Sequence, residues 1–204
     1  DMPGGAQPLV SYDGRWIGVV NGELYDFEEH RARLQAEGVT FKTQSDSEIL
    51  LNLFAKYGPK GLTGLSGEFA FIFYDRKGKK LCFGRDPFGV KPLFYESRSD
   101  SFTLASEMKA LHDEKPVFDE VYLKTFLARM MAPPRTSLEN VRHVWPGRVY
   151  TLDLELKTLS WEIYQPLPLF QKRDLSTLEA VELLEQELRA SVKRRLRADV
   201  DVGC

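Results

Sequence analysis

The sequence predicts an α+β fold, in which helices and antiparallel hairpins come in separate blocks. Two observations support this prediction. Two segments with helical spacing lie together before residue 60, strand–turn–strand patterns begin near residue 69, and this block order favours α+β layers over a βαβ repeat. The 204 residues, 43% hydrophobic and 28% charged, suffice for one large domain or for one domain with part of a second.

Capping signals predict two helices early in the chain. A capping box that begins at Asp26 precedes a helix of about ten residues, which closes at Gly38. Ser45 and Glu48 form a second capping box, and apolar residues then repeat at helical spacing until a Gly-Pro pair stops the helix.

From residue 69 onward the hydrophobic period becomes that of strands. Phe69–Tyr74 leads through a polar turn into a second strand at 81–83, and a further hairpin spans 93–105. A helix is predicted over about 119–131, and it should end there because two prolines follow it. The last hairpin covers 148–164.

A change in composition near residue 165 predicts a domain boundary. Segment 165–175 contains two prolines and little periodicity, so we interpret it as a linker between a domain at 1–164 and the start of another at 176–204. Ser176 opens a capping box before a long amphipathic helix, and an alternating valine pattern after the helix indicates the start of a strand.

Composition excludes several classes of function. A net charge of −2 and a pI near 6.0 give no electrostatic footprint for nucleic acid or an anionic membrane, so small partners are expected. Two cysteines, Cys82 and Cys204, and no signal peptide or spanning segment indicate a reducing, cytoplasmic setting. His30, His112 and His143 are too far apart in sequence to predict a metal site.

Val19–Glu23 is a short apolar run that ends in Asn-Gly-Glu. Asn-Gly is a common tight-turn signal, so a turn is one interpretation. The alternative is a strand that presents two hydrogen-bond donors at its end, the Asn21 side-chain amide and the unhindered backbone N–H of Gly22. Two such donors can hold an oxyanion.

Three other tempting features are given structural interpretations. Arg85 and Asp86 are expected to form a buried or half-buried ion pair at a strand end. Ser106 and Glu107 have no nearby histidine in the sequence, which favours capping of a helix start over catalysis. Cys82 lies in an apolar strand pattern, which is typical of a small buried thiol.

Six motifs occur in the order seen in glutamine-dependent asparagine synthetases. They are GAQPL (5–9), NGELY (21–25), SDSE (45–48), LSGEFAF (65–71), GRDPFGVKPLFY (84–95) and ASEMKAL (105–111). The chain therefore resembles the class II glutamine amidotransferase half of that family along nearly its whole length. The resemblance implies an N-terminal nucleophile hydrolase fold, a four-layer αββα sandwich that is incomplete at its N-terminus here. Residues 176–204 resemble the first helix and strand of the family's ATP-pyrophosphatase domain.

The resemblance also implies a glutaminase site that feeds ammonia to a synthetase site. In the family, an N-terminal cysteine attacks the side-chain amide of glutamine and forms a thioester. Asn21 and the N–H of Gly22 match the oxyanion hole, and Glu23 and Asp46 match positions that hold the α-amino end of glutamine. Asp46 also suits a helix N-cap, and both roles can coexist.

The chain departs from the family pattern at its beginning. It starts at Asp1, in a loop that the family places after the cysteine and after an arginine that grips the glutamine carboxylate. We therefore expect this chain alone to have neither glutaminase nor synthetase activity. The resemblance places ATP and Mg²⁺ in the synthetase domain, so no cofactor or metal is expected on this chain, and it leaves a homodimer open.

Three functions remain in view. The first is the glutaminase part of an asparagine synthetase, which uses ATP to amidate aspartate. The second is a related amidotransferase acting on another carboxylate, as in natural-product or β-lactam synthetase pathways. The third is a non-catalytic interaction domain. A cysteine encoded directly after an initiator methionine upstream of Asp1 would support the two glutaminase interpretations.

Overall fold

The computed structural model describes residues 5–25, 27–111, 115–130, 133–167 and 173–196. Two antiparallel sheets form its centre. The larger sheet contains, in spatial order, β1 (Leu9–Val10), β2 (Trp16–Leu24), β3 (Gly67–Asp75), β4 (Lys80–Arg85), β8 (Arg148–Asp153) and β9 (Thr158–Ile163). The smaller sheet contains β6 (Phe102–Ala105), β5 (Phe94–Ser97) and β7 (Val141–His143).

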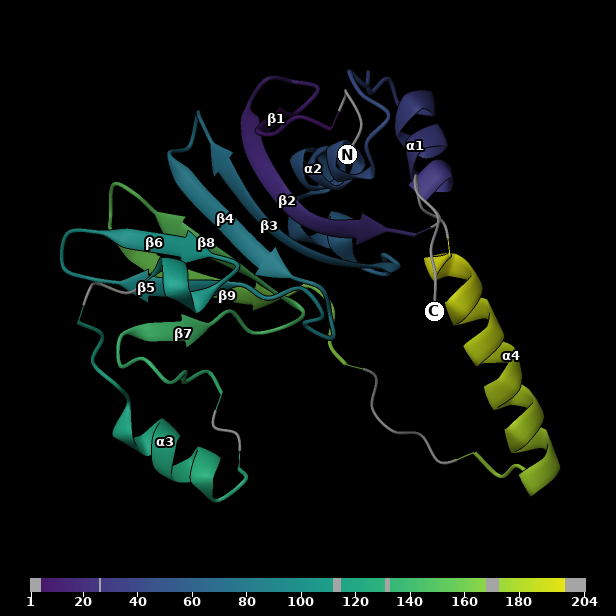
Figure 1. Cartoon of the computed structure of the whole chain (residues 1–204). Coiled ribbons are helices and arrows are strands. Elements are labelled where there is room, and N and C mark those ends of the chain that lie inside the picture. The colour runs from purple at the N-terminus through teal and green to yellow at the C-terminus, as the bar shows by residue number, and fades with distance from the viewer. Residues whose placement is uncertain (1–4, 26, 112–114, 131–132, 168–172, 197–204) are drawn as a thin grey trace.

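Four helices among the described residues accompany the two sheets (Figure 1). They are α1 (Phe27–Ala36), α2 (Asp46–Tyr57), α3 (Glu120–Leu127) and α4 (Thr177–Arg195), with short 3₁₀ turns η1 (Gly58–Leu62) and η2 (Met108–Ala110). α2 covers one face of the larger sheet, α1 packs against α2, and the smaller sheet lies over the other face, whereas α3 lies beyond β7 and none of its described residues is buried. The predicted α+β class is confirmed.

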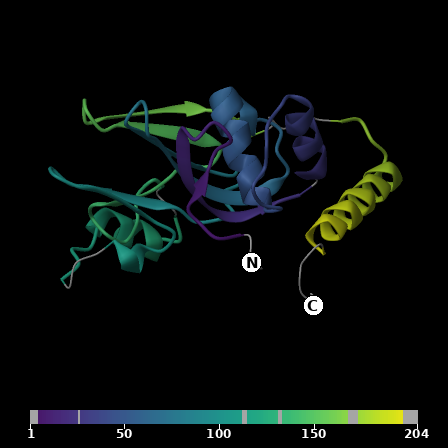
Figure 2. The same ribbon diagram turned by 90° about the horizontal axis from the view of Figure 1, so that it is seen from above.

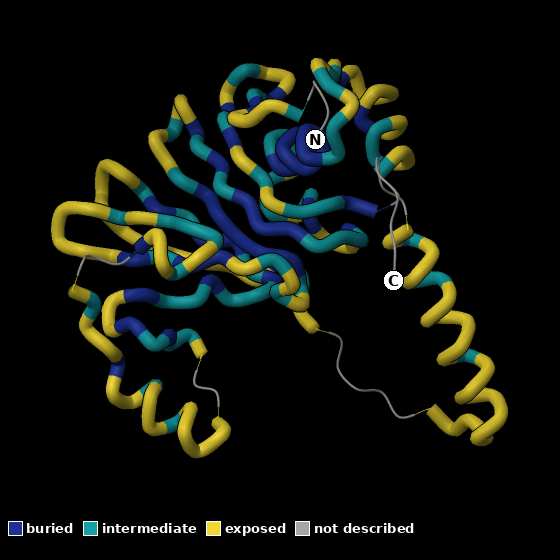
Figure 3. The backbone as a smooth tube through the Cα atoms, viewed as in Figure 1, coloured by how far each residue is buried: buried dark blue, intermediate teal, exposed yellow. Residues whose placement is uncertain are grey.

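The first hydrophobic core lies between α2 and the larger sheet. Phe69, Phe71 and Phe73 alternate along β3 and all face this core, because side chains two apart share one face of a strand. Trp16 of β2 packs edge-on against Phe54 of α2, with ring centroids 5.1 Å apart. These contacts bury the central strands most deeply (Figure 3).

The second core fills the space between the two sheets. The alternate residues of β3, Ala70 and Ile72, face it together with Phe83 of β4. Phe83 stacks on Tyr150 of β8 at 5.2 Å and contacts Phe102 of β6 at 5.7 Å, so aromatic rings join the sheets. The smaller sheet thus lies over the β4–β8 half of the larger sheet (Figure 1).

The two early helices form where the sequence predicts them, but the predicted capping box of Ser45 and Glu48 does not form. α1 ends before Gly38, which has a φ of +85°; Asp26 lies outside the described residues. Ser45 caps α2, yet its side chain accepts from the N–H of Ser47, and Glu48 does not reach back to it. Glu48 is buried and instead accepts the N–H groups of the preceding loop, those of residues 42 and 43.

The later helices differ more from expectation. α3 is shorter than predicted and is capped by Asp119, whose carboxylate accepts from the N–H of Tyr122. α4 confirms the predicted capping box of Ser176. Most of its apolar residues lie exposed, and α4 stands to one side of the sheets (Figure 2). The strand expected after it lies outside the described residues. No helix in the described part of the chain is long and apolar enough to cross a membrane.

The Asp75 carboxylate holds the turn of the β3–β4 hairpin, and it should make the free energy of unfolding depend on pH. Its carboxylate accepts from Arg15 at 2.9 and 2.5 Å and from the backbone N–H groups of Lys77 and Gly78. The Arg15 hydrogen bonds are the largest cause of a fall in the Asp75 pKa to about 2.

A carboxyl group whose pKa is lower in the folded than in the unfolded state stabilises the folded state at pH values above the unfolded pKa. This contribution is lost as the pH falls through the folded pKa. We therefore expect Asp75→Asn to lower the free energy of unfolding at neutral pH by about 2 kcal/mol. The difference from wild type should shrink as pH falls from about 4 towards 2. Urea unfolding at several pH values measures it, and a pH-independent difference would contradict the assignment.

Candidate functional site

Asn21, Gly22 and Glu23 lie inside β2, so the turn interpretation is wrong. They pair with Ala70, Phe69 and Glu68 of β3. The strand does not end at Asn-Gly either, because it continues to Leu24. Pairing with β3 over nine residues outweighs the local turn preference of the dipeptide.

The backbone at position 22 accepts only glycine. Its φ is +155°, and a Cβ built on it would lie 2.1 Å from the carbonyl oxygen of Glu68 and 2.5 Å from the Cα of Phe69. Both of these atoms belong to the backbone of β3 and cannot rotate away. The close approach of β2 and β3 therefore requires glycine here.

The backbone N–H of Gly22 faces the outer edge of β2, away from β3. Successive N–H groups of a strand point to opposite edges, so Val20, Gly22 and Leu24 share one edge. The N–H of Val20 donates to Oε1 of Gln7 at 2.7 Å, and that of Leu24 donates to Oδ2 of Asp46 at 2.6 Å. The N–H of Gly22, between them, has no acceptor among the residues that the structure describes. It is available to a ligand oxygen.

Asn21 presents the second predicted donor, next to Gly22. Its side chain is exposed on the face of β2 opposite to α2. Its Nδ2 lies 3.4 Å from Oγ of Ser106, directly after β6. An amide nitrogen has two N–H groups, so one can be held by Ser106 while the other remains free.

The capping interpretation of Ser106 and Glu107 is wrong. No side chain caps η2, and Glu107 instead pairs with Lys109, with 2.5 Å between Oε2 and Nζ. Sequence reasoning missed the contact of Ser106 with Asn21 because the two residues lie 85 positions apart. It also left Gln7 without a role, although the motif at 5–9 was visible.

Asp46 links the end of β2 to the start of α2. Besides the N–H of Leu24, its carboxylate accepts the N–H of Ser47 at 2.7 Å. It is the first residue of α2, since Ser45 holds the N-cap, so the N-cap interpretation of Asp46 is wrong. Its charge benefits there from the helix dipole.

Charged side chains of both signs lie near Glu23, since Lys91 pairs with Glu68 at 3.1 Å. The pKa of Tyr25 is raised, mainly by burial and then by the charges of Glu68 and Glu23. Arg195, at the end of α4, lies over the Tyr25 ring at 5.2 Å and opposes this rise. Carboxylates near one strand end, with two neutral donors beside them, suit a ligand that carries both an ammonium group and a carbonyl oxygen.

Comparison with families of known proteins identifies the family of this chain. The model of the glutamine amidotransferase domain matches residues 1–164. The chain belongs to the glutamine amidotransferase family.

Curated relatives of this amidotransferase chain include asparagine synthetases. It is 31% identical to glutamine-hydrolysing asparagine synthetase 1 of Bacillus subtilis, over 100% of this chain and 32% of the relative. It is 35% identical to a probable asparagine synthetase of Schizosaccharomyces pombe, over 98% and 31%. The chain thus spans about a third of the length of these relatives.

Solved structures show the same fold. Glutamine phosphoribosylpyrophosphate amidotransferase of Bacillus subtilis matches with a TM-score of 0.55 and 22% identity, over 78% of this chain and 32% of that one. The expected fold of class II amidotransferases, with its N-terminal nucleophile hydrolase architecture, is thereby confirmed.

Cys82 of the amidotransferase chain is buried, as predicted. Its Sγ lies 3.6 Å from Oγ1 of Thr151 in the neighbouring strand. Burial raises the pKa of its thiol, which disfavours the thiolate that a nucleophile needs. Cys204 and His112 lie outside the described residues. Within the described ranges, no group of three histidine, cysteine or acidic residues could hold a metal ion.

Arg85 and Asp86 are buried, but each is held by backbone groups and not by a direct ion pair. The Arg85 guanidinium donates to the carbonyls of Gly89, Lys91 and Val144 at 2.5–3.1 Å. The Asp86 carboxylate accepts the N–H groups of Phe88, Val90 and Lys91 at 3.0–3.1 Å. The two side chains shape the loop after β4 of the amidotransferase fold.

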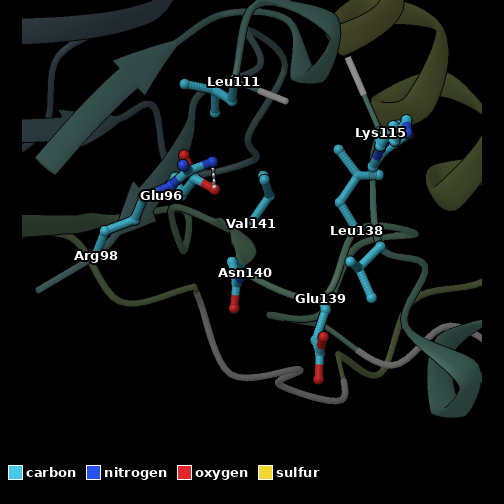
Figure 4. Close-up of a pocket in the computed structure, with 10 residues that line it drawn as sticks. Glu96, Arg98, Leu111, Lys115, Leu138, Glu139, Asn140 and Val141 are labelled. Carbon is cyan, nitrogen blue, oxygen red and sulfur yellow. Dashed lines mark hydrogen bonds and ion pairs between the residues drawn. The ribbon is translucent and has the colours of Figure 1, made fainter. Parts of the chain in front are cut away.

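A small cavity lies away from the Asn21 corner. It has a volume of about 60 Å³ and is lined by residues of β5, β7 and nearby loops, among them Glu96 and Arg98 (Figure 4). These two side chains pair at 2.9 Å. None of the predicted site residues of the amidotransferase lines this cavity, whose size suits only a few water molecules.

Proposed function

We propose that the corner formed by Asn21, Gly22, Glu23 and Asp46 is the glutamine site of a glutaminase. The observation that carries the proposal is the open N–H of Gly22, which lies on the edge of β2 between two N–H groups that already have partners. Together with the Asn21 amide, it supplies the two donors that the oxyanion of a tetrahedral intermediate needs.

The two carboxylates suit the other end of the substrate. Glutamine carries an α-ammonium group, which needs acceptor oxygens. Glu23 lies directly after Gly22, and Asp46 bonds to the N–H of the residue after Glu23. One short stretch of β2 and the start of α2 therefore offer groups for both the amide and the ammonium end of glutamine.

Hydrolysis in this site requires a nucleophile close to Asn21. Attack of a thiol on the amide carbon forms a tetrahedral intermediate, and the proton that the thiol loses is transferred to the amide nitrogen. The C–N bond breaks, ammonia leaves, and water then hydrolyses the thioester to release glutamate and the thiol. Cys82 is buried in the sheet and does not suit this role. We assign the role to the N-terminal cysteine that the family resemblance implies, which is not part of Asp1–Cys204.

The released ammonia is proposed to amidate a carboxylate in an ATP-dependent reaction. Aspartate is the first acceptor to test, because the relatives include glutamine-hydrolysing asparagine synthetases. Another carboxylate is the second candidate, since proteins named amidase chry2 and amidase chyE are 33% and 32% identical to this chain.

Other parts of the assignment follow from the same proposal. We place ATP and Mg²⁺ in a synthetase domain whose first helix is α4, with 165–175 as the linker. A cytoplasmic setting, small-molecule substrates, no nucleic acid or membrane partner and a homodimer belong to this proposal.

The test is a glutaminase assay in two forms of the protein. We expect no glutamate release by Asp1–Cys204 alone, and release by the protein expressed from its complete reading frame. In the latter, Asn21→Ala should lower kcat by about two to three orders of magnitude, because one oxyanion donor is lost.

Asn140→Ala is the matched control, since Asn140 is an exposed asparagine in the loop before β7. It should leave the rate unchanged. Full activity of the Asn21 variant, or glutamate release by the isolated chain, would contradict the proposed site.

A further inference from the structure

Gln7 lies against the edge of β2 immediately before the proposed oxyanion donors. Its Oε1 accepts from the N–H of Val20 at 2.7 Å, and its Nε2 donates to the carbonyl oxygen of Val20 at 2.8 Å. One side chain thus satisfies both polar groups of a β2 residue, as the backbone of a neighbouring strand would.

This contact ends the pairing between β1 and β2. The backbone of β1 pairs with β2 only through Leu9 with Gly18 and Val10 with Ile17. The next edge-facing residue of β2 is Val20, and there the Gln7 carboxamide replaces the strand backbone. A side-chain amide offers one acceptor and one donor to this edge and then stops, whereas a continuing strand would also cover Gly22.

The far side of Gly22 is closed in a similar way. The N–H of Leu24, the next on the same edge, is taken by the carboxylate of Asp46. Side chains of two different segments therefore hold the edge of β2 on both sides of the open N–H of Gly22. An edge left without partners on either side would be free to twist or to recruit another strand.

We propose that Gln7 is a positioning residue of the glutamine site. Its carboxamide fixes the peptide groups on both sides of Val20, and with them the start of Asn21, while it leaves the N–H of Gly22 uncovered for the substrate oxygen. The inference rests on the proposed function of this site.

The test compares Gln7→Met with Gln165→Met. Methionine keeps the approximate length of glutamine and removes both hydrogen bonds. Gln165 is a matched control, because its Oε1 also accepts a backbone N–H, that of Gly64 at 3.0 Å, but away from β2. Two quantities are measured: hydrogen exchange of the Val20 amide by NMR in Asp1–Cys204, and the KM for L-glutamine in the glutaminase assay of the protein expressed from its complete reading frame.

We expect Gln7→Met to speed exchange at Val20 about tenfold and to raise the KM for glutamine about fivefold, the range expected for losing such hydrogen bonds. Gln165→Met should change neither. The KM change is the readout that a merely structural role would not produce.

Faster exchange at Val20 with an unchanged KM for glutamine would overturn the positioning role and leave the glutamine site intact. Rapid exchange at Val20 already in the wild-type chain would overturn its structural basis. If the wild-type protein expressed from its complete reading frame does not hydrolyse glutamine, the proposed function fails and this inference fails with it, an outcome distinct from the other two.

Discussion

Replacing Gly22 with alanine is expected to lower the free energy of unfolding by about 4 kcal/mol, the combined cost of overpacking and of an unfavourable backbone angle. The added Cβ would lie 2.1 Å from the carbonyl oxygen of Glu68, so β2 and β3 would have to separate. These two strands share nine paired positions, and separation disturbs the centre of the larger sheet. Urea unfolding followed by circular dichroism measures the loss.

Gly38→Ala separates the two causes. Gly38 has a φ of +85°, but nothing lies within 4 Å of its ideal Cβ, so alanine there incurs only the backbone cost of about 1 kcal/mol. Equal losses in the two variants would show that the contact with Glu68 has no energetic importance.

Replacing Asp86 with alanine is expected to lower the free energy of unfolding by about 3 kcal/mol, because three backbone N–H groups lose their acceptor. Asp86 is fully buried, so water cannot replace the carboxylate easily. Its neighbour Arg85 is buried too, and the nearby negative charge supports the Arg85 cation, whose pKa is lowered by burial. Thermal and urea unfolding of the variant measure the loss.

Asp153→Ala is the matched control for this loop. Asp153 accepts the N–H groups of Glu155 and Leu156 in the β8–β9 hairpin, but that turn is exposed to water. The loss there should be about 1 kcal/mol. If Asp86→Ala costs no more than Asp153→Ala, the loop after β4 does not depend on its buried carboxylate.

Local signals in the sequence predicted most of the elements. The aromatic residues of β3 and the glycine after α1 are signals that depend only on neighbours a few residues away in the sequence. Both the strand and the helix end lie where these signals predict them. The box at Ser45 failed because Glu48 is drawn into a buried loop contact, which its spacing from Ser45 does not reveal. Tertiary partners decided that case.

The candidate site was predicted by residue type but not by geometry. Asn21, Gly22 and Asp46 were visible as donors and acceptors, and the surrounding motifs favoured an oxyanion hole over a turn, but the pairing with β3 became known only from the structure. The contacts of Gln7 and Ser106 join positions 13 and 85 residues apart. No periodicity in the chain encodes such separations, so only the folded structure could place these side chains.

Because Trp16 packs against Phe54, tryptophan fluorescence can report on the core between α2 and the larger sheet. Trp16 is buried there, whereas Trp161 lies 53% exposed on β9, at the opposite edge of the larger sheet. An indole in an apolar core emits at shorter wavelength than one in water and is shielded from dissolved quenchers. With Trp145 and Trp161 replaced by phenylalanine, the fluorescence of Trp16 therefore reports loosening around β2 and α2, next to the proposed glutamine site.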